Sequence, residues 1–280
     1  MNFSPPPHSM NLKKLIRFFT AKDLNLPVLV TFTGGMGAQV ISAAIYYSMR
    51  SAGHTVYADL SYFNQTESIA IAGNLGDCSH WSWQLEPFKL TPTSFELPPP
   101  TSDRKNYNVV QDGPQKLELA LNALSQTEIQ RYFKIPTGVD DVLPSEFADG
   151  YLCMHVRRGD YVNVASHLVA DGDFSSLARN FSGLVSNAVV ISDSPIELDF
   201  QNVVSSYFKQ VIFLDNTDAF TAHRIMRNAR ILICSNSQFS LIAAVLNPNA
   251  LKIIPKQWFG GKNRHIEAAL NSHCLFQIME

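Results

Sequence analysis

The second half of the chain alternates short apolar runs with helical segments, and this alternation restricts the fold more than any other feature of the sequence. Five runs rich in β-branched residues are predicted to be strands, over Tyr151–Val156, Ala188–Ile191, Val211–Leu214, Ile231–Cys234 and Leu251–Ile254. Helices are predicted over Phe174–Ser186, Pro195–Tyr207, Asp218–Ala229, Phe239–Leu246 and Asn263–Leu270. Such βαβ units, with right-handed crossovers, form a parallel sheet covered by helices on both faces.

The first half begins with the same alternation and then loses it. A strand, a tight turn, a helix and a second strand are predicted over Pro27–Thr33, Gly34–Gly37, Ala38–Ala52 and Thr55–Ala58. Residues 60–105 are rich in Trp, Pro and Ser, so we expect an irregular segment there. A third strand and two more helices are predicted over Tyr107–Val110, Gln115–Leu124 and Thr127–Lys134.

A chain of 280 residues with 46% hydrophobic content is long enough for two domains, each with its own core. The stretch 135–148 contains Pro136, Gly138 and Pro144 and is predicted to be the linker. The expected division is a leader over 1–26, a first Rossmann-like domain over 27–148 and a second Rossmann-like domain over 149–280. The expected fold class is therefore α/β, with two Rossmann-like domains facing a cleft and the first less regular than the second.

Composition excludes several classes of partner. The net charge of −2 gives no field that would attract nucleic acid, and no apolar run is long enough to span a membrane. The basic, apolar segment Asn11–Phe19 could touch an anionic membrane surface, but a helix packed on the domain or a flexible leader is the favoured interpretation. Cys153 and Cys234 lie in apolar runs, which favours small buried side chains over disulfides or zinc ligands. We expect a cytoplasmic protein, in contact at most with the inner face of the membrane.

A polar cluster follows the first strand of the second half. It reads His155, Val156, Arg157, Arg158, Gly159, Asp160 and Tyr161. Ligands of open α/β sheets bind at the carboxyl ends of the strands, and the planar fork of arginine suits phosphate oxygens. Adjacent arginines on an extended backbone point opposite ways, so both reach one ligand only if the chain turns, as Gly159 permits. A surface ion-pair cluster around Asp160 is the structural alternative.

Two further segments have residues suited to phosphate binding. Ser235, Asn236 and Ser237 lie where a predicted strand passes into a helix, and they are normal helix N-caps that can also hold a phosphate. The turn from Gly34 to Gly37 lets backbone approach a ligand closely. The run 35–40, with Asp59 at a later strand end, partly fits a dinucleotide fingerprint, but Val40 replaces its third small residue.

Together these segments resemble the α-1,2-fucosyltransferase family, glycosyltransferase family 11. The resemblance covers four blocks in the family's order. Residues 33–39 read Thr-Gly-Gly-Met-Gly-Ala-Gln, and residues 155–162 read His-Val-Arg-Arg-Gly-Asp-Tyr-Val. Residues 191–194 read Ile-Ser-Asp-Ser, and the block 226–247 contains Ser-Asn-Ser-Gln-Phe-Ser. The middle of the first half matches weakly. The chain also departs from the family at Ala38, Ser194, Leu241 and Ile242, where the family has Asn, Asp and a Trp pair.

The resemblance implies a GT-B fold and an inverting, metal-independent transfer of L-fucose from GDP-L-fucose to a glycan hydroxyl, expected to be an α-1,2 linkage to a galactoside in bacterial surface polysaccharide synthesis. It implies that Arg157 and Arg158 hold the donor diphosphate, one as a direct clamp and one supporting the loop. The further donor-site residues that it implies are His155, Asp193, Ser194, Ser235, Asn236, Ser237, Phe239 and Ser240. Gly34, Gly35, Gly37 and Gln39 are expected at the cleft.

The chemistry of glycosyl transfer is consistent with these residues. Negative charge grows on the departing phosphate, and a fixed guanidinium opposite it lowers the barrier. Asp160 is the nearest carboxylate to serve as base, with Asp171 and Asp173 as alternatives, although Asp160 could instead brace an arginine. Asp171 and Asp173 also have metal-ligand spacing, but acidic pairs in loops are usually solvated, so no metal or other cofactor is expected.

Three alternatives remain open at this point. The same fold could use a different nucleotide-sugar, because Ser194 replaces an acidic residue suited to guanine. The chain could bind a nucleotide or glycan without catalysis. The glycine turn could belong to an NAD-type oxidoreductase.

Overall fold

The computed structural model describes residues 26–64, 82–163, 167–248, 251–255 and 276–279, and all structural statements concern these residues. The segment 11–19, the helix predicted over 263–270, and Cys78 and Cys274 lie outside them. The chain divides into two compact units, with the described residues up to Lys134 in the first and those from Ile135 onward in the second.

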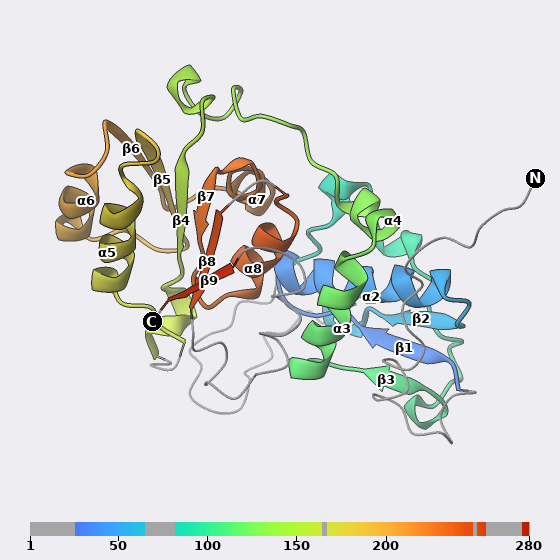
Figure 1. Ribbon diagram of the computed structural model, residues 1–280. Coiled ribbons are helices and arrows are strands. Elements are labelled where there is room, and N and C mark those ends of the chain that lie inside the picture. The colour runs from blue at the N-terminus through green and yellow to red at the C-terminus, as the bar shows by residue number, and fades with distance from the viewer. Residues whose placement is uncertain (1–25, 65–81, 164–166, 249–250, 256–275, 280) are drawn as a thin grey trace, which may run out of the picture. The chain divides into compact units, whose positions relative to one another are not determined.

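The first unit is built on a parallel sheet of three strands in the order β2-β1-β3. These are β1 (Val28–Thr31), β2 (Val56–Asp59) and β3 (Asn108–Val110). Helix α2 (Met36–Ser51) connects β1 to β2, and α3 (Pro114–Leu124) and α4 (Thr127–Gln130) follow β3 (Figure 1). Every residue of β1 is buried, as expected of the central strand of a parallel sheet. The irregular segment between β2 and β3 contains only short 3₁₀ helices among its described residues, over Ser61–Asn64, Glu86–Phe88, Pro92–Ser94 and Arg104–Asn106.

The second unit is a parallel sheet in the order β6-β5-β4-β7-β8-β9. Its strands are β4 (Leu152–Val156), β5 (Asn187–Ser192), β6 (Gln210–Leu214), β7 (Ile231–Ile233), β8 (Leu251–Pro255) and β9 (Phe276–Met279). The strand order is that of a doubly wound nucleotide-binding sheet. β4 lies in the middle of the sheet and is buried throughout.

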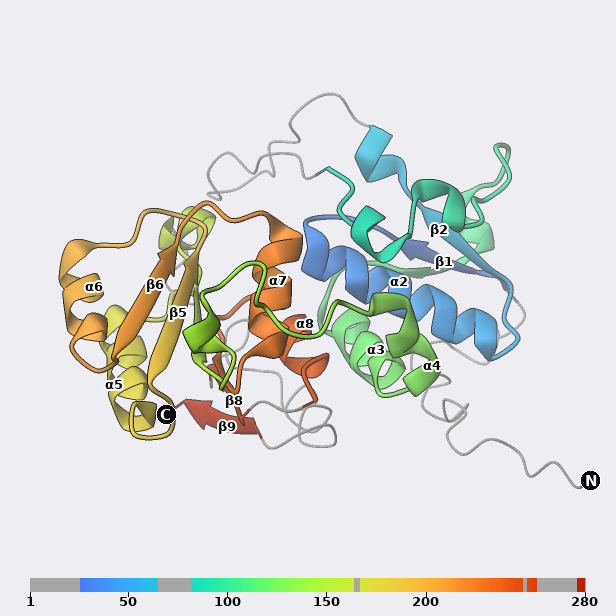
Figure 2. The same ribbon diagram turned by 90° about the horizontal axis from the view of Figure 1, so that it is seen from above.

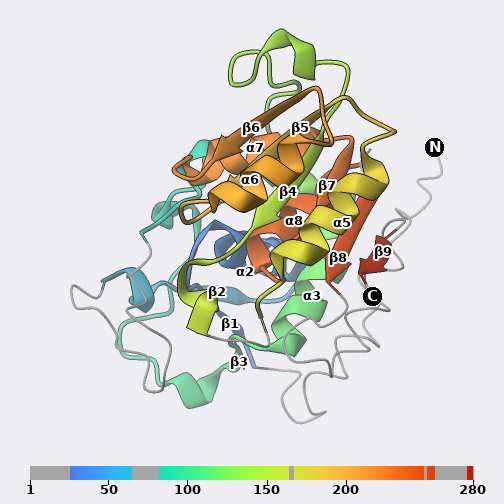
Figure 3. The same ribbon diagram turned by 90° about the vertical axis from the view of Figure 1, so that its left-hand side faces the viewer.

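Among the described residues, four helices cover the two faces of this sheet. They are α5 (Asp171–Phe181), α6 (Leu198–Ser205), α7 (Ala219–Asn228) and α8 (Gln238–Val245). α5 packs beside α6 and α7 packs beside α8, with the sheet between the two pairs (Figures 2 and 3). This placement follows from right-handed crossovers that run first to one side of β4 and then to the other.

The predicted class, α/β with two Rossmann-like domains, is confirmed by the two parallel sheets. The predicted strands are present within one or two residues of their predicted bounds, and β9 was not predicted. Helix α5 begins at Asp171, three residues before its predicted start, because Asp171 and Asp173 favour a first helical turn. The cleft between the two domains stays a prediction.

The segment 135–148, predicted to be a linker, packs with the second unit. Val139, Leu143 and Phe147 are buried, and the carboxylate of Asp141 forms an ion pair with Arg224 of α7 at 2.6 Å. Apolar anchors hold this stretch even though it contains proline and glycine. The division at 148–149 from the sequence and the division at 134–135 from contacts differ by this segment.

Cys153 on β4 and Cys234 after β7 are buried free thiols, as the sequence predicts. Burial raises the pKa of both thiols, that of Cys234 to about 12. Among the described residues, none of the helices combines the length and the apolar character that crossing a membrane requires.

Candidate functional site

The candidate site lies at the carboxyl ends of β4 and β7. From β4 the chain builds β5 and β6 on one side and then returns to the other side of β4 to form β7. The point where the direction reverses is where open α/β sheets bind ligands. The cluster that begins at His155 follows β4, and Ser235 to Ser240 follow β7, so the fold brings together the two polar segments that the sequence singles out.

His155 joins the ends of these two strands. Its Nδ1 lies 2.8 Å from the Ser235 hydroxyl, and its ring contacts the Phe239 ring at a centroid distance of 5.5 Å. Burial, together with the charge of Arg157, lowers the pKa of His155 to about 3. The imidazole is therefore neutral at physiological pH and supports the site by hydrogen bonding and packing.

Arg157 presents its guanidinium at the end of β4. Its Nη1 lies 2.8 Å from the Oδ2 atom of Asp193, which follows β5, and its guanidinium carbon lies 5.2 Å from the centre of the Tyr161 ring. The Arg157 side chain is 19% exposed. A guanidinium at the end of a central strand that is still reachable from solvent is suited to bind an incoming anion.

Arg158 points to a different set of partners, as the alternation of side chains on an extended backbone predicts. Its guanidinium donates to the Val169 carbonyl at 2.9 Å, forms an ion pair with Asp171 at the start of α5, and lies over the Phe174 ring. Of the predicted pair, Arg157 thus has the geometry of the clamp, and Arg158 ties the loop to α5.

Gly159 makes the turn between the two arginines and the following 3₁₀ helix. Its φ is +20°, and a Cβ atom at this position would lie 2.4 Å from Asp193 Oδ2. Asp193 also accepts a hydrogen bond from the Arg158 backbone N–H at 2.7 Å, and the Ser194 hydroxyl accepts one from the Gly159 N–H at 3.0 Å. The end of β5 therefore fixes the course of the chain after β4.

The segment after β7, residues 235–240, is held by hydrogen bonds among its own residues. Ser235, Asn236 and Ser237 are buried, and the Ser237 hydroxyl caps α8 by accepting from the Phe239 N–H at 3.3 Å. Ser240 donates back to this loop from the first turn of the helix. The predicted N-cap is confirmed, and the start of α8 lies beside His155, whose ring contacts Phe239.

Phe239 also contacts a second buried histidine that the sequence analysis did not single out. His223 of α7 lies with its ring centre 5.4 Å from that of Phe239. Burial lowers its pKa well below the ordinary value, so it too is neutral. Only its position between the apolar residues of an amphipathic helix could have indicated this packing.

A cavity of about 360 Å³ opens beside Arg158, at the carboxyl ends of β4 and β5. Val156, Val162, Pro195, Ile196 and Phe200 supply its apolar wall, and Arg158, Gly159, Asp171, Ser192, Ser194 and Glu197 the rest. Its volume is within the range of small-ligand pockets.

Glu197 was missed by the sequence analysis. Its carboxylate makes no hydrogen bond or ion pair with any other residue that the structure describes. The signal that could have found it is its place just after the carboxyl end of a strand, three residues beyond Ser194.

The glycine turn lies in the first unit, between β1 and α2. Gly34 has a φ of +67°, and Gly35 caps α2 in an extended conformation. The buried amide of Gln39 donates to the Gly34 and Ser82 carbonyls at 2.8 and 2.9 Å and accepts from the Gln84 N–H at 2.8 Å. Gln39 thus fastens the turn within its own unit, whereas the sequence analysis expected it at the cleft with Gly37.

The three carboxylates considered as bases have different surroundings in the structure. The backbone of Asp160 lies in the 3₁₀ helix Gly159–Asn163, but its side chain is outside what the structure describes. Asp171 is committed to Arg158, and Asp173 lies in the first turn of α5. No group of three or more His, Cys, Asp or Glu side chains in the described ranges is arranged to hold a metal ion.

Comparisons with known proteins bear only on the fold. No family model matches the chain, and a search of curated proteins found no match. Among solved structures, a glycosyl transferase of family 9 from Veillonella parvula DSM 2008 has a TM-score of 0.45 at 10% identity over 91% of this chain and 86% of its own. The E. coli heptosyltransferase WaaC with ADP has 0.43 at 11%, over 90% and 92%. POFUT1 in complex with GDP-fucose has 0.39 at 11%, over 82% and 96%. At these TM-scores, the strand orders remain the basis for the fold.

Proposed function

We propose that this chain is an inverting glycosyltransferase that moves L-fucose from GDP-L-fucose to a hydroxyl of a glycan acceptor, without a metal. The observation that carries the proposal is the position of Arg157, a partly exposed guanidinium at the carboxyl end of β4, the switch point of a doubly wound sheet, where it pairs with Asp193. The choice of fucose rests on the resemblance of the motifs at 33–39, 155–162, 191–194 and 226–247 to the α-1,2-fucosyltransferase family.

Arg157 is the group that stabilises the leaving diphosphate. In the resting site Asp193 neutralises it, and a bound diphosphate competes with Asp193 for the guanidinium. Negative charge on the phosphate grows as the bond to the sugar breaks, so the interaction is stronger in the transition state than in the ground state.

The surrounding residues hold this constellation in place before the donor arrives. Arg158 connects the loop to Asp171, Gly159 lets it pass close to Asp193, and His155 links it to Ser235. Dipoles and charges that are already fixed need no reorganisation during the reaction. This electrostatic preorganisation is usually the largest contribution that such a site makes to catalysis.

The cavity beside Arg158 is assigned to the guanine base of the donor. Its apolar wall suits a flat ring, and the uncommitted carboxylate of Glu197 can accept from the N1–H and the exocyclic amine of guanine together. Glu197 therefore supplies the acidic group that the replacement at Ser194 removes.

An oxidoreductase is less compatible with the contacts at the glycine turn. A dinucleotide would need the free N–H groups at the start of α2, but the Met36 N–H already donates to the Gln84 side chain at 2.6 Å. Asp59, which would bind the ribose, accepts from the Ser61 hydroxyl at 2.6 Å and pairs with Arg104.

Ligand-dependent thermal unfolding tests the proposal. GDP at about 100 times its Kd should stabilise the chain by about 2.7 kcal/mol, whereas NAD should have no effect. Arg157→Lys should lose most of the GDP effect and of the transfer activity, because an ammonium cannot reproduce a bidentate fork. EDTA should leave the rate unchanged. Stabilisation by NAD and not by GDP would reject the proposal.

Base selection is tested with inosine diphosphate, which lacks the exocyclic amine of guanine. The wild-type chain should bind GDP about tenfold or more tightly than inosine diphosphate, and Glu197→Gln should reduce this preference, since a hydrogen bond to a charged group is lost. Asp199→Asn, on the same helix but outside the cavity, is the matched control. An unchanged preference in Glu197→Gln would remove Glu197 from base recognition.

A further inference from the structure

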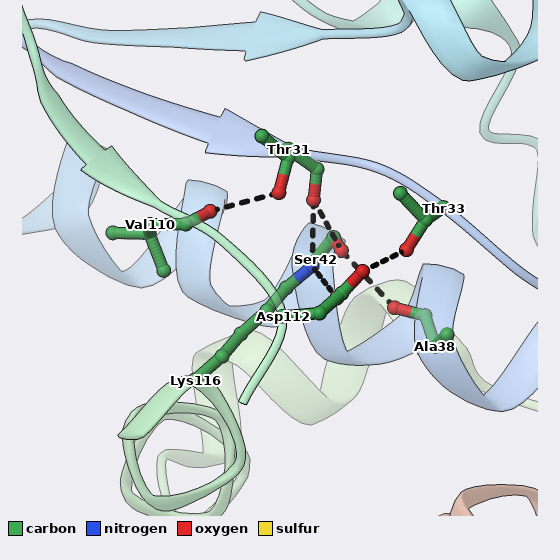
Figure 4. A network of polar contacts seen from close by, with 7 residues as sticks. All are labelled: Thr31, Thr33, Ala38, Ser42, Val110, Asp112 and Lys116. Carbon is green, nitrogen blue, oxygen red and sulfur yellow. Dashed lines mark hydrogen bonds and ion pairs between the residues drawn. The ribbon is translucent and has the colours of Figure 1, made fainter. Parts of the chain in front are cut away.

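The first unit has its own switch point, where a carboxylate is held in a fixed position. β1 lies between β2 and β3, so the carboxyl ends of β1 and β3 border the place where the chain reverses direction across the sheet. Thr31 and Thr33 stand at the end of β1, and Asp112 stands two residues beyond β3. Figure 4 shows these side chains converging with Lys116 of α3.

Both oxygens of the Asp112 carboxylate accept a hydrogen bond from within the unit. Oδ1 accepts from Lys116 Nζ at 2.9 Å, and Oδ2 accepts from the Thr33 hydroxyl at 2.6 Å (Figure 4). The Asp112 side chain is nevertheless 57% exposed. A carboxylate has about four acceptor positions, so the orientation is fixed while further positions remain open to a ligand.

Lys116 is buried to an extent that a surface ion pair does not explain. Its side chain is 3% exposed, and burial lowers its pKa while the charge of Asp112 opposes that shift. Lysine is rarely buried so completely, because removing its charge from water is costly. An apolar side chain would fill the same volume without that cost.

The ammonium has a second partner at the end of β1. Lys116 donates to the Thr31 carbonyl at 2.6 Å, and the Ser42 hydroxyl lies 3.0 Å from the same oxygen (Figure 4). Ser42 has one hydroxyl proton and also lies 3.1 Å from the Ala38 carbonyl, so it supplies at most one of these two hydrogen bonds. Lys116 therefore ties the Asp112 carboxylate to the end of β1.

We propose that Asp112, oriented by Lys116 and Thr33, binds a hydroxyl group of the sugar acceptor at the switch point of the first unit. This inference rests on the proposed function, which requires a neutral, hydroxyl-bearing acceptor. An ionised carboxylate only accepts hydrogen bonds, so it selects hydroxyl donors and repels phosphates. Lys116 offsets its charge, which reduces its attraction for cations. Lys116 and Thr33 are positioning residues in this arrangement.

The test measures binding of methyl β-galactoside to the full chain by ligand-observed NMR, in the presence of saturating GDP. Asp112→Asn should weaken the galactoside Kd about tenfold or more, as expected for the loss of a hydrogen bond to a charged group, and should leave the Kd for GDP unchanged. Asp103→Asn is the matched control, since Asp103 pairs with Lys105 and is 54% exposed, but its lysine is exposed as well.

Thr33→Val and Lys116→Met should weaken galactoside binding in the same direction by freeing the carboxylate. A purely structural role would lower the unfolding temperature of these variants and leave the galactoside Kd unchanged at temperatures where they are folded. If Lys116→Met fails to fold, Asp112→Asn and Thr33→Val still decide the question. Wild-type affinity in Asp112→Asn, or a wild-type chain that binds GDP but not the galactoside, would overturn the inference. Absence of GDP binding would instead contradict the proposed function.

Discussion

Asp193 is the residue around which the donor-side turn is organised. Its carboxylate pairs with the guanidinium of Arg157 and accepts from the backbone N–H of Arg158, so two successive residues close on one side chain. Gly159 comes next, and the space that a Cβ would need is taken by an oxygen of the same carboxylate. The position of the arginine clamp therefore depends on an acidic residue of the neighbouring strand and on the absence of a side chain at 159.

Gly159→Ala should destabilise the second unit and weaken GDP binding. The new Cβ would lie 2.4 Å from Asp193 Oδ2, and the φ of +20° is one that alanine rarely adopts. Strain of this kind costs roughly 1–3 kcal/mol, which urea unfolding can measure, and GDP titration reports the displaced clamp. Gly172→Ala is the matched control, because no atom lies within 4 Å of its Cβ position and alanine is preferred in a helix. Equal stability and equal GDP affinity in Gly159→Ala and the wild type would contradict this account of the turn.

The positions of some site residues could be predicted from the sequence, and those of others could not. The string from His155 to Gly159 could be located because a buried strand, two arginines and a glycine form a local pattern. The partners of the arginines could not, since the register of β4 with β5 brings Asp193 to Arg157, and the start of α5 brings Asp171 to Arg158. Lys116 was assigned to a helix, but nothing in its surroundings in the sequence indicates that its ammonium is buried.

At the level of elements, the strands were more predictable than the helix ends. β4 and β5 are buried throughout, and the continuous apolar runs in their sequences are typical of buried parallel strands. Helix bounds depend on capping and on contacts outside the helix. α5 begins at Asp171, where first-turn carboxylates and the pair with Arg158 extend the helix beyond its apolar periodicity. The segment 135–148 looked like a linker because its buried anchors are widely spaced.

The helix pair α7–α8 and strand β4 enclose two neutral histidines, which predicts a loss of stability in acid. Burial lowers the pKa of His155 to about 3 and that of His223 well below its ordinary value, while both titrate near 6.5 in the unfolded chain. The unfolded state then binds more protons, so the stabilisation is complete above pH 6.5 and is lost as the pH falls toward 3. Arg157 and Arg227, which lie close by, further disfavour the charged form.

Urea unfolding at pH 7.5 and pH 5 measures this dependence. Each buried histidine should contribute up to about 1.4 kcal/mol per pH unit to the decline between these conditions. His223→Leu should reduce the slope, because an apolar residue removes one titrating group from the buried set. His54→Leu is the control, since His54 lies in the first unit and is not one of the buried pair. An acid slope that is the same in His223→Leu and the wild type would refute the assignment of the slope to the buried pair.

At the level of the whole molecule, the two units repeat one design with different chemistry. In each unit, the chain first builds strands on one side of the central strand and then crosses to its other side. The strand formed after this reversal lies next to the central strand: β3 lies beside β1, and β7 lies beside β4. The second unit places a guanidinium and a helix N-terminus at that point, which suits an anion. The first unit places a carboxylate there, which suits a hydroxyl donor. This difference in charge supports the proposal of a donor site on the second unit and an acceptor site on the first.

Hydrogen exchange with each ligand separates the two sites. GDP should protect backbone amides most strongly in the second unit, at residues 157–161, 192–198 and 235–240, because these segments carry the clamp, the cavity and the start of α8. Methyl β-galactoside, added after GDP, should extend protection to residues 31–34 and 110–116 of the first unit. The order of these effects matters, since a phosphate-binding glycine turn would make the first unit respond to GDP alone. Protection by GDP confined to residues 34–40 would favour the dinucleotide interpretation and exclude the donor site at β4 and β7.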